Sequence, residues 1–447
     1  MRRSIILVLL SLFAHAALAG TTAIINVNVV PMDVERIVAG QTVVITDGLI
    51  TRIGPVDEVP VPKKSDVVDG TDRFLIPGLA EMHAHVPAVG SENLDRDFSL
   101  FVANGVTLLR GMLGRPSHLQ LRADLLEGKV FGPRLITSGP SMNGQSVNGS
   151  SEAESLVRAQ HAAGYDFVKI HPGLKADEFE AIARTANELG IPFAGHVTVA
   201  VGVERAVEAG IATIDHLDGY MAAMLPPDSG ASGGYGGFFD VLLADQVMDE
   251  RITELARLTA ASGTWNVPTN VLVEQRISEV PAAELRSRAE MAYMPVATLQ
   301  RWVVSKQETI SDRGFTPQVA ARAIELRRRL ILALHDSGAG LLLGSDAPQV
   351  FNVPGFSLHR ELQNLVVAGL TPYEALRTGT VNVSRFLGTN TGVVAEGRDA
   401  DLVLLDANPF EDIANTRRVH GVVLRGVWWS AYELQQRIDR YRNEHSR

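Results

Sequence analysis

The sequence predicts an α/β protein: a (β/α)8 TIM barrel with a small β-sandwich domain formed by the N- and C-terminal segments. Three observations lead to this prediction. Through residues 77–390, short apolar runs alternate with amphipathic helical patterns, which is typical of parallel βα units. Eight such runs occur there, the number that closes a barrel. Stretches rich in β-branched residues flank this region on both sides, so both ends of the chain are expected to build the smaller domain.

The first nineteen residues have the pattern of a targeting signal and are not expected to be part of the fold. Met1-Arg2-Arg3 is a short basic start, an apolar run covers residues 5–17, and Ala17-Leu18-Ala19 is a small-x-small cleavage pattern. We therefore expect a signal peptide over residues 1–19 that is cut near Ala19, a secreted or periplasmic protein, and no stable membrane anchor after cleavage. An uncleaved anchor is the alternative, but the apolar run is short for a membrane span.

The β-sandwich is predicted from residues 20–76 and 391–430. In the first segment, Asp47-Gly48 is a turn signal between two runs of β-branched residues. The second segment alternates apolar runs with turns such as Glu396-Gly397-Arg398. Residues 431–447 are predicted as a C-terminal helix.

The barrel is predicted over residues 77–390, and helical patterns follow nearly all of its strands. The helix over residues 176–189 ends before Gly190, and the helix over residues 358–368 ends before Gly369. An open doubly wound sheet is the alternative, but no Gly-x-Gly-x-x-Gly follows an early strand. The eight predicted strands are Leu79–Val86, Val106–Arg110, Arg134–Ser138, Phe167–His171, Pro192–His196, Ala212–His216, Thr264–Thr269 and Gly340–Asp346.

Two long segments are predicted as insertions in the barrel. Residues 218–239 follow the sixth strand and are rich in Gly, Ser and Pro, with Tyr235, Phe238 and Phe239 as apolar surface. A loop of this length at a barrel mouth is expected to cover the active site. Residues 282–336 are charged and helical, and a solvated hairpin, a lid and a dimer contact remain open for them.

Charge and cysteine content limit the possible partners and ligands. The net charge of −10 comes without a long single-sign run, so it favours solubility and argues against nucleic acid as a partner. The chain has no cysteine, so disulfides are excluded and any metal must be held by nitrogen and oxygen ligands.

Five side chains of types that commonly bind metals, and one lysine, stand at the ends of predicted strands, where barrel enzymes carry their active sites. Separately, each has a structural explanation, such as a core histidine or a helix N-cap. A lysine between apolar residues, however, must shed or pair its charge. Because all six fall on strand ends, we predict a metal site. The six are His83 and His85, which point to the same side of strand one, Lys169 on strand four, His196 on strand five, His216 on strand six and Asp346 on strand eight.

This ordered set resembles the amidohydrolase superfamily, metal-dependent hydrolases on a (β/α)8 barrel with a flanking β-sandwich. Within it, the chain is most similar to the imidazolonepropionase-like group, which includes metal-dependent prolidases, Xaa-amino-acid dipeptidases and ochratoxinase. The matching pieces are Pro77-Gly78-Leu79 with His83-x-His85, then Lys169, His196, His216 and Asp346, then His359-Arg360-Glu361-Leu362 with Gly369-Leu370-Thr371-Pro372, and Glu396-Gly397-x-x-Ala400-Asp401.

The resemblance implies two divalent metal ions, with Zn²⁺ as the default metal and Mn²⁺ or Co²⁺ as alternatives. His83, His85 and Asp346 would hold the first ion, and His196 and His216 the second. An N6-carboxylated Lys169 and a hydroxide would bridge them. Asp346 would also be the catalytic residue, which takes the proton of the attacking hydroxide and passes it to the leaving amine.

The implied reaction is hydrolysis of an amide or peptide bond in a small carboxylate-bearing substrate, a dipeptide or an N-acyl amino acid. The alternatives are a lactonase or esterase, a mononuclear cyclic-amide hydrolase or deaminase, and a non-catalytic binding protein. The last is disfavoured because all six positions are present. Homo-oligomerisation is left open. Candidate substrate contacts are His171, which faces the same side as Lys169, and Arg110, Tyr220 and Asn270; His171 could instead pack a loop, and Arg110 could pair with a neighbouring acid.

Overall fold

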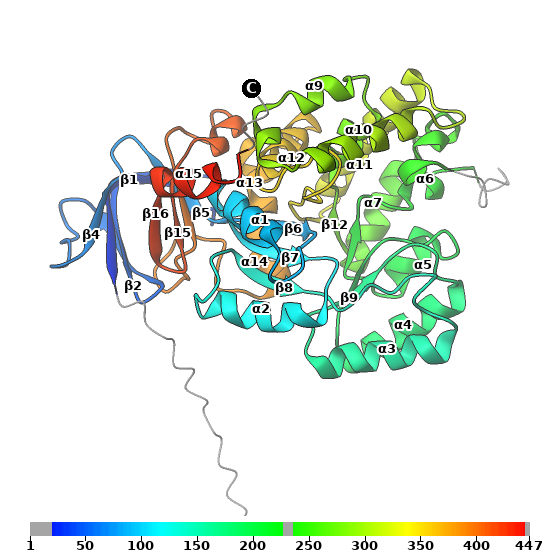
Figure 1. Ribbon diagram of the computed structural model, residues 1–447, viewed down its shortest axis with the longest axis horizontal. Helices are drawn as coiled ribbons and strands as arrows, with labels where there is room; N and C mark the ends of the chain where they lie inside the picture. Colours follow the sequence, from blue (N-terminus) through cyan, green and yellow to red (C-terminus); the bar gives the residue numbers. More distant parts are fainter. Residues whose placement is uncertain (1–19, 227–235, 443–447) are drawn as a thin grey trace, which may run out of the picture.

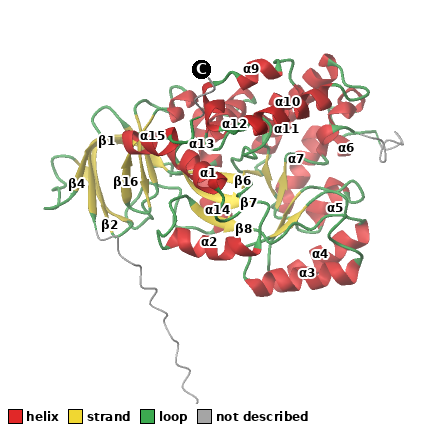
Figure 2. Ribbon diagram, in the orientation of Figure 1, coloured by secondary structure: helices red, strands yellow, loops and turns green. Residues whose placement is uncertain are grey.

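The computed structural model describes residues 20–226 and 236–442. The predicted signal peptide (1–19), the centre of the Gly-rich loop (227–235) and the last five residues (443–447) lie outside the described residues. A β-rich part forms one end of the molecule, and a larger part with mixed helices and strands forms the rest (Figures 1 and 2).

Segments from both ends of the chain share one eight-stranded sheet. Strand β5 pairs antiparallel with β14, with Leu75 opposite Leu404, which joins the N-terminal strands to the C-terminal ones. The order is β16-β15-β14-β5-β1-β2-β3, and β4 pairs with β1. The strands are β1 (Thr21–Val29), β2 (Val38–Thr46), β3 (Leu49–Pro55), β4 (Asp66–Asp69), β5 (Phe74–Pro77), β14 (Leu402–Leu405), β15 (Val419–Leu424) and β16 (Val427–Ser430).

The predicted Asp47-Gly48 turn connects β2 to β3. Both residues have left-handed backbone, with φ of 51° at Asp47 and 80° at Gly48, as the tightest hairpin turns require. Thr46 therefore lies directly opposite Leu49.

All eight predicted barrel strands are present, and their hydrogen-bonded neighbours run parallel. They form two arcs, β6-β7-β8 and β9 to β13 in sequence order. Parallel bridges between Ser138 and Phe167 and between Ala84 and Ala347 join the arcs, so the strands close into a (β/α)8 barrel. Its strands are β6 (Leu79–Ala84), β7 (Val106–Gly111), β8 (Arg134–Thr137), β9 (Val168–Ile170), β10 (Phe193–Gly195), β11 (Thr213–Asp215), β12 (Trp265–Val267) and β13 (Gly340–Leu341).

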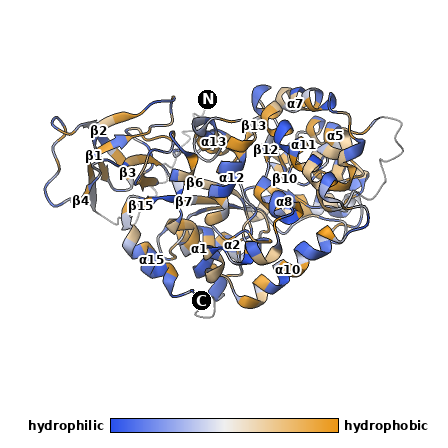
Figure 3. Ribbon diagram, turned by 90° about the horizontal axis from the view of Figure 1, so that it is seen from above, coloured by the Kyte–Doolittle hydropathy of each residue, from blue (hydrophilic) through white to orange (hydrophobic). Residues whose placement is uncertain are grey.

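Amphipathic helices surround the barrel, with apolar and polar residues alternating along them (Figure 3). Helix α4 ends where predicted, because Gly190 takes the left-handed C-cap conformation. None of the helices in residues 20–226 and 236–442 is long and apolar enough to cross a bilayer. The α-helices and 3-10 helices (η) are α1 (Glu92–Ala103), α2 (Pro116–Leu126), α3 (Ser150–Ala163), α4 (Ala176–Leu189), α5 (Gly202–Glu208), α6 (Tyr220–Ala223), η2 (Phe238–Gln246), α7 (Arg251–Ser262), α8 (Asn270–Ile277), α9 (Ala282–Arg286), η3 (Ala289–Tyr293), α10 (Val296–Ile310), α11 (Pro317–Asp336), α12 (Phe356–Val367), α13 (Pro372–Thr378), α14 (Val381–Leu387), η4 (Ile413–Arg417) and α15 (Ala431–Asp439).

The predicted insertion over residues 282–336 consists of two different parts. Helices α9 and α10 pack around a separate apolar cluster that includes Leu299 and Trp302. Helix α11 instead packs on α7 and β13, as a barrel helix does. Its Arg327 donates to the backbone oxygens of His216 and Pro268 at 2.8 and 2.9 Å. The insertion therefore ends before α11, whose charged sequence concealed its place in the barrel.

Candidate metal centre

The six predicted side chains meet at the C-terminal end of the barrel. Five are buried, and the side chain of His85 is 20% exposed. His83 lies on β6 and Lys169 on β9, and His85, His196, His216 and Asp346 stand in the chain that leaves β6, β10, β11 and β13.

His83, His85 and Asp346 are close enough to share one cation. Each offers one ligand atom, and the three atoms lie within 4.8 Å of one another. Nε2 of His85 is 3.1 Å from Oδ1 of Asp346, and Nε2 of His83 is 3.8 Å from the same oxygen. Two imidazoles and a carboxylate are a ligand set that suits Zn²⁺.

His196 and His216 form a second pair beside the first. Their ring centroids are 4.7 Å apart, and the ring of His216 is 4.4 Å from that of His83. Nδ1 of His196 lies 2.9 Å from Oδ2 of Asp218, and Nδ1 of His216 lies 2.8 Å from the hydroxyl of Thr269. Nδ1 of His216 also lies 3.6 Å from Oδ2 of Asp346. A hydrogen bond at Nδ1 leaves Nε2 of each ring available to a metal, as is common for metal-binding histidines.

Lys169 is completely buried, and its Nζ has no hydrogen-bond partner. Its nearest carboxylate oxygen, Oδ2 of Asp215, is 3.7 Å away. Oδ1 of Asp346 is also buried without a hydrogen bond. Buried polar atoms are costly unless they bind something, so these two atoms fit a site that holds metal ions.

Burial also favours the uncharged forms of these groups. It lowers the pKa of His83, His196 and His216 well below the ordinary value and that of His85 to about 3. It lowers the pKa of Lys169 and raises that of Asp346, against the attraction between the two groups. Neutral imidazoles can bind a metal without first losing a proton, whereas Asp346 must release one.

The structure adds three acids that sequence reasoning missed. Asp215 lies beneath His83, and Asp218 contacts His196. The signal for both was their place in Asp215-His216-Leu217-Asp218, beside a predicted ligand. Glu81 accepts hydrogen bonds from the backbone of His83 and Ser345, which ties β6 to the loop that carries Asp346.

Two of the predicted substrate contacts are instead buried in polar networks. Arg110 is 1% exposed and pairs with Asp215, with NH2 3.0 Å from Oδ1, so the alternative role, pairing with an acid, is the one observed. Asn270 accepts from Arg327 and donates to Glu274. Neither side chain is free to contact a substrate.

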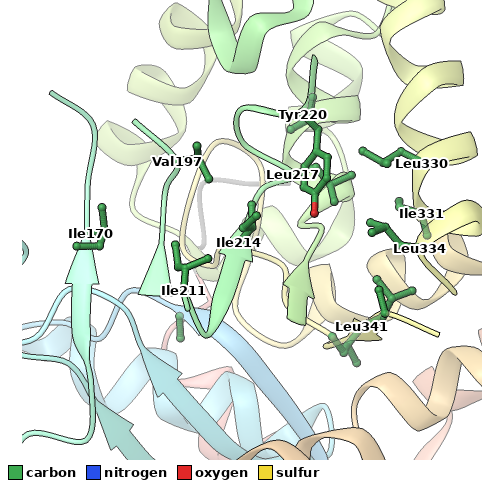
Figure 4. Close-up of a cluster of buried hydrophobic side chains, with 14 of the residues drawn as sticks. Ile170, Val197, Ile211, Ile214, Leu217, Tyr220, Leu330, Ile331, Leu334 and Leu341 are labelled. Atoms are coloured by element: carbon green, nitrogen blue, oxygen red, sulfur yellow. The ribbon is translucent and has the colours of Figure 1, made fainter. Parts of the chain in front are cut away.

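Tyr220 is also directed away from the centre. Its hydroxyl bonds to Thr259 and Asn266, and its ring lies in the apolar cluster with Leu217 and Leu330 (Figure 4). The prediction that it contacts substrate is therefore not supported.

His171 does reach the site. Its ring stacks on that of His196, with centroids 4.9 Å apart and planes 28° apart. Burial lowers its pKa to about 3, so the ring is neutral. Its role as a substrate contact stays a prediction.

Phe239, at the described end of the Gly-rich loop, covers the second histidine pair. Its ring lies 4.8 Å from that of His216 and 6.0 Å from that of His196, nearly parallel to the latter. Phe239 and Asp240 both have positive φ, 50° and 58°. Such strain in residues other than glycine persists only where the surroundings enforce it, and it often marks functional sites.

Comparisons with known proteins identify the family and the fold. The model of the amidohydrolase family matches residues 74–429. The ochratoxinase of Aspergillus niger is 24% identical over 426 residues, covering 86% of this chain and 81% of that protein. Among solved structures, bottromycin amidohydrolase (22% identity, TM-score 0.72, covering 95% of this chain and 92% of that one) and a putative prolidase from Bifidobacterium longum (22%, 0.65, covering 95% and 99%) share the fold. The family match covers most of the chain and confirms the prediction of a hydrolase that acts on carbon–nitrogen bonds. The chain belongs to the amidohydrolase family.

Proposed function

We propose that the protein is an exported binuclear amidohydrolase that cleaves an amide or peptide bond in a small carboxylate-bearing substrate, such as a dipeptide or an N-acyl amino acid. The observation that carries the proposal is Lys169, a fully buried amine without a hydrogen-bond partner. It stands on β9 between the strands that bear the two histidine pairs. By the resemblance to the superfamily, a lysine at the end of this strand is typical of binuclear members and generally absent from mononuclear ones.

Two divalent ions, Zn²⁺ by default, would be held by His83, His85 and Asp346 on one side and by His196 and His216 on the other. Lys169, N6-carboxylated, would serve both. A neutral amine can add CO₂, and burial lowers the pKa of Lys169 in the direction that favours the neutral form. When bound, the ions would activate a water molecule and polarise the carbonyl of the scissile bond.

The protein's own residues would transfer protons, shield the site from water and contact the substrate. The carboxylate of Asp346 would accept the proton of the attacking water and return it to the leaving amine. Phe239 would exclude bulk water from the second histidine pair. His171, whose ring stacks on that of His196, would contact the substrate beside the second histidine pair. Closing such a site strengthens every electrostatic interaction within it.

The substrate class is argued from the relatives. Their names describe an ochratoxinase, an amidohydrolase and a putative prolidase, which favours an amide or peptide bond over an ester or lactone. Because Arg110 is paired with Asp215, the preference for a carboxylate does not rest on that guanidinium. Export is proposed from residues 1–19, and mass spectrometry of the N-terminus of the exported protein would test for cleavage near Ala19.

The test is a screen of the metal-loaded protein against dipeptides and N-acyl amino acids, with the ester and lactone analogues of the same acyl groups in parallel. We expect amides with a free carboxylate to be cleaved with the highest kcat/KM. Blocking that carboxylate as a methyl ester or amide is the matched comparison for each substrate. Faster turnover of lactones, or release of ammonia from cyclic substrates alone, would contradict the proposal.

A further inference from the structure

A buried carboxylate that is not among the implied metal ligands lies next to the imidazole of His83. Asp215 is the last residue of β11 and has no exposed surface. Its Oδ1 accepts hydrogen bonds from NH2 of Arg110 at 3.0 Å and from the hydroxyl of Thr213 at 2.8 Å. Its Oδ2 has no hydrogen-bond partner and lies 3.1 Å from Nδ1 of His83. One oxygen is therefore fixed, and the other lies nearest to the histidine, with Nζ of Lys169 farther off at 3.7 Å.

Arg110, on β7, holds this carboxylate in place through hydrogen bonds to residues of β6 and β11. Its Nε donates to the carbonyl of Met82, the residue before His83, at 2.7 Å. Its NH1 reaches the hydroxyl of Thr213 at 3.2 Å, and the rings of Phe167 and Phe386 flank the guanidinium. The guanidinium thus ties β6, β7 and β11 together, so neither Asp215 nor the backbone at His83 can shift freely.

His83 lies between two carboxylates. Its Nδ1 faces Asp215, and its Nε2 faces Asp346 at 3.8 Å. A neutral imidazole carries one N–H, and the two possible positions differ in consequence. A proton on Nδ1 can be donated to Oδ2 of Asp215 and leaves the lone pair of Nε2 for a metal. With the proton on Nε2, the lone pair of Nδ1 would instead face Oδ2 of Asp215, and the two would repel each other.

Nδ1 of each of the other three histidines makes a hydrogen bond, whereas Nδ1 of His83 lies near Asp215 without one to any described residue. Nδ1 of His196 lies 2.9 Å from Oδ2 of Asp218, and Nδ1 of His216 lies 2.8 Å from the hydroxyl of Thr269. Nδ1 of His85 lies 3.3 Å from the amide nitrogen of Gln349, which can only donate. Asp218 and Thr269 can therefore accept a proton from Nδ1 of His196 and His216. Asp215, 3.1 Å from Nδ1, is the group placed to do so for His83.

We propose that Asp215 is a positioning residue: it accepts the Nδ1–H of His83, and Arg110 fixes its orientation, so that Nε2 of His83 is presented to the first metal ion. The proposal rests on the proposed metal site and goes beyond it by naming residues that orient a metal ligand without contacting the metal. Outer partners of metal-binding histidines typically change metal affinity when they are removed, even though they never touch the metal.

The test compares two fully buried aspartates that each pair through Oδ1 with a guanidinium. Asp97 is also fully buried, pairs through Oδ1 with a guanidinium, that of Arg96, and has an Oδ2 without a hydrogen-bond partner. It lies on α1. Asp215→Asn places an amide that can donate, but not accept, toward His83 if its oxygen stays with Arg110. Asp97→Asn makes the identical change away from the centre.

The measurement is the affinity for Zn²⁺ and Co²⁺, by competition with a chromophoric chelator, together with the visible spectrum of bound Co²⁺. Asp215→Asn is expected to weaken binding of the first ion, the one held by His83, by about 10–100-fold and to alter the spectrum, with Asp97→Asn close to wild type. Equal affinities and spectra in Asp215→Asn and wild type would overturn the role of Asp215 alone. A wild-type protein that binds no metal would overturn the proposed function as well.

Should Asp215→Asn fail to fold, nitrogen-15 spectra of histidine-labelled wild-type protein loaded with Zn²⁺ decide the question. A proton on Nδ1 of His83 supports the proposal, and a proton on Nε2 refutes it.

Discussion

Replacing Arg110 with methionine tests whether this side chain is structural or binds substrate. Methionine keeps the apolar stem but removes every hydrogen bond from the guanidinium, including the one to Asp215 at 3.0 Å. Both partners are buried, so Asp215 would lose its guanidinium and keep only the hydroxyl of Thr213 as a hydrogen-bond donor, with Nζ of Lys169 3.7 Å away. Removing one partner of a buried pair costs about 3–5 kcal/mol.

That cost can be converted to a melting temperature. An unfolding entropy of about 2.1 cal/mol/K per residue gives roughly 0.9 kcal/mol/K for a chain of 447 residues, so Arg110→Met should lower Tm by about 3–6 °C. Circular dichroism melts of the metal-free protein measure it. The control is Arg158→Met, which breaks the exposed pair with Glu188 and should leave Tm unchanged within about 1 °C. The reasoning would be refuted if Arg110→Met had the same Tm as the wild type and instead had a higher KM for carboxylate-bearing substrates.

Three further predictions concern the centre itself. Asp346→Asn should keep the fold by circular dichroism but lose about 10²–10⁴ in kcat, because the proton acceptor is gone; activity within about tenfold of wild type, about 1.4 kcal/mol of barrier, would reduce Asp346 to a ligand or cap. Metal affinity should fall as the pH is lowered from neutrality toward the ordinary pKa of an aspartate. Burial raises the pKa of Asp346, so protons compete with the metal for its carboxylate in this range. The histidines, whose pKa burial lowers, stay neutral there. Chelator competition across that range measures it, and a flat profile would contradict it. Phe239→Ala should leave metal content intact but change kcat/KM unequally among substrates, since its ring lies over the second histidine pair; an equal change for all of them would show that the ring does not select.

The strand pattern and the six strand-end side chains could be predicted because they depend on short-range rules. Alternation within a strand places His83 and His85 on one side, and parallel strands of a barrel end at a common rim. The Asp47-Gly48 turn is likewise a local signal, confirmed by the left-handed backbone of both residues.

What sequence could not supply is the partner of each polar side chain. Arg110 and Asp215 are 105 positions apart, and nothing near Arg110 shows that its charge is neutralised inside the barrel. Tyr220 has a hydroxyl that suits substrate binding, but its direction depends on Thr259 and Asn266, from an adjoining helix and strand. Phe239 owes its place over the histidines to a strained backbone that no propensity predicts.

The central claim is the binuclear centre, and metal content measures it most directly. Protein purified without chelator, with bicarbonate present, should contain close to two divalent ions per chain by elemental analysis, and Lys169→Ala should lose the second ion while it remains folded. A stoichiometry of one that is the same in wild type and Lys169→Ala, and that bicarbonate does not change, would contradict the account.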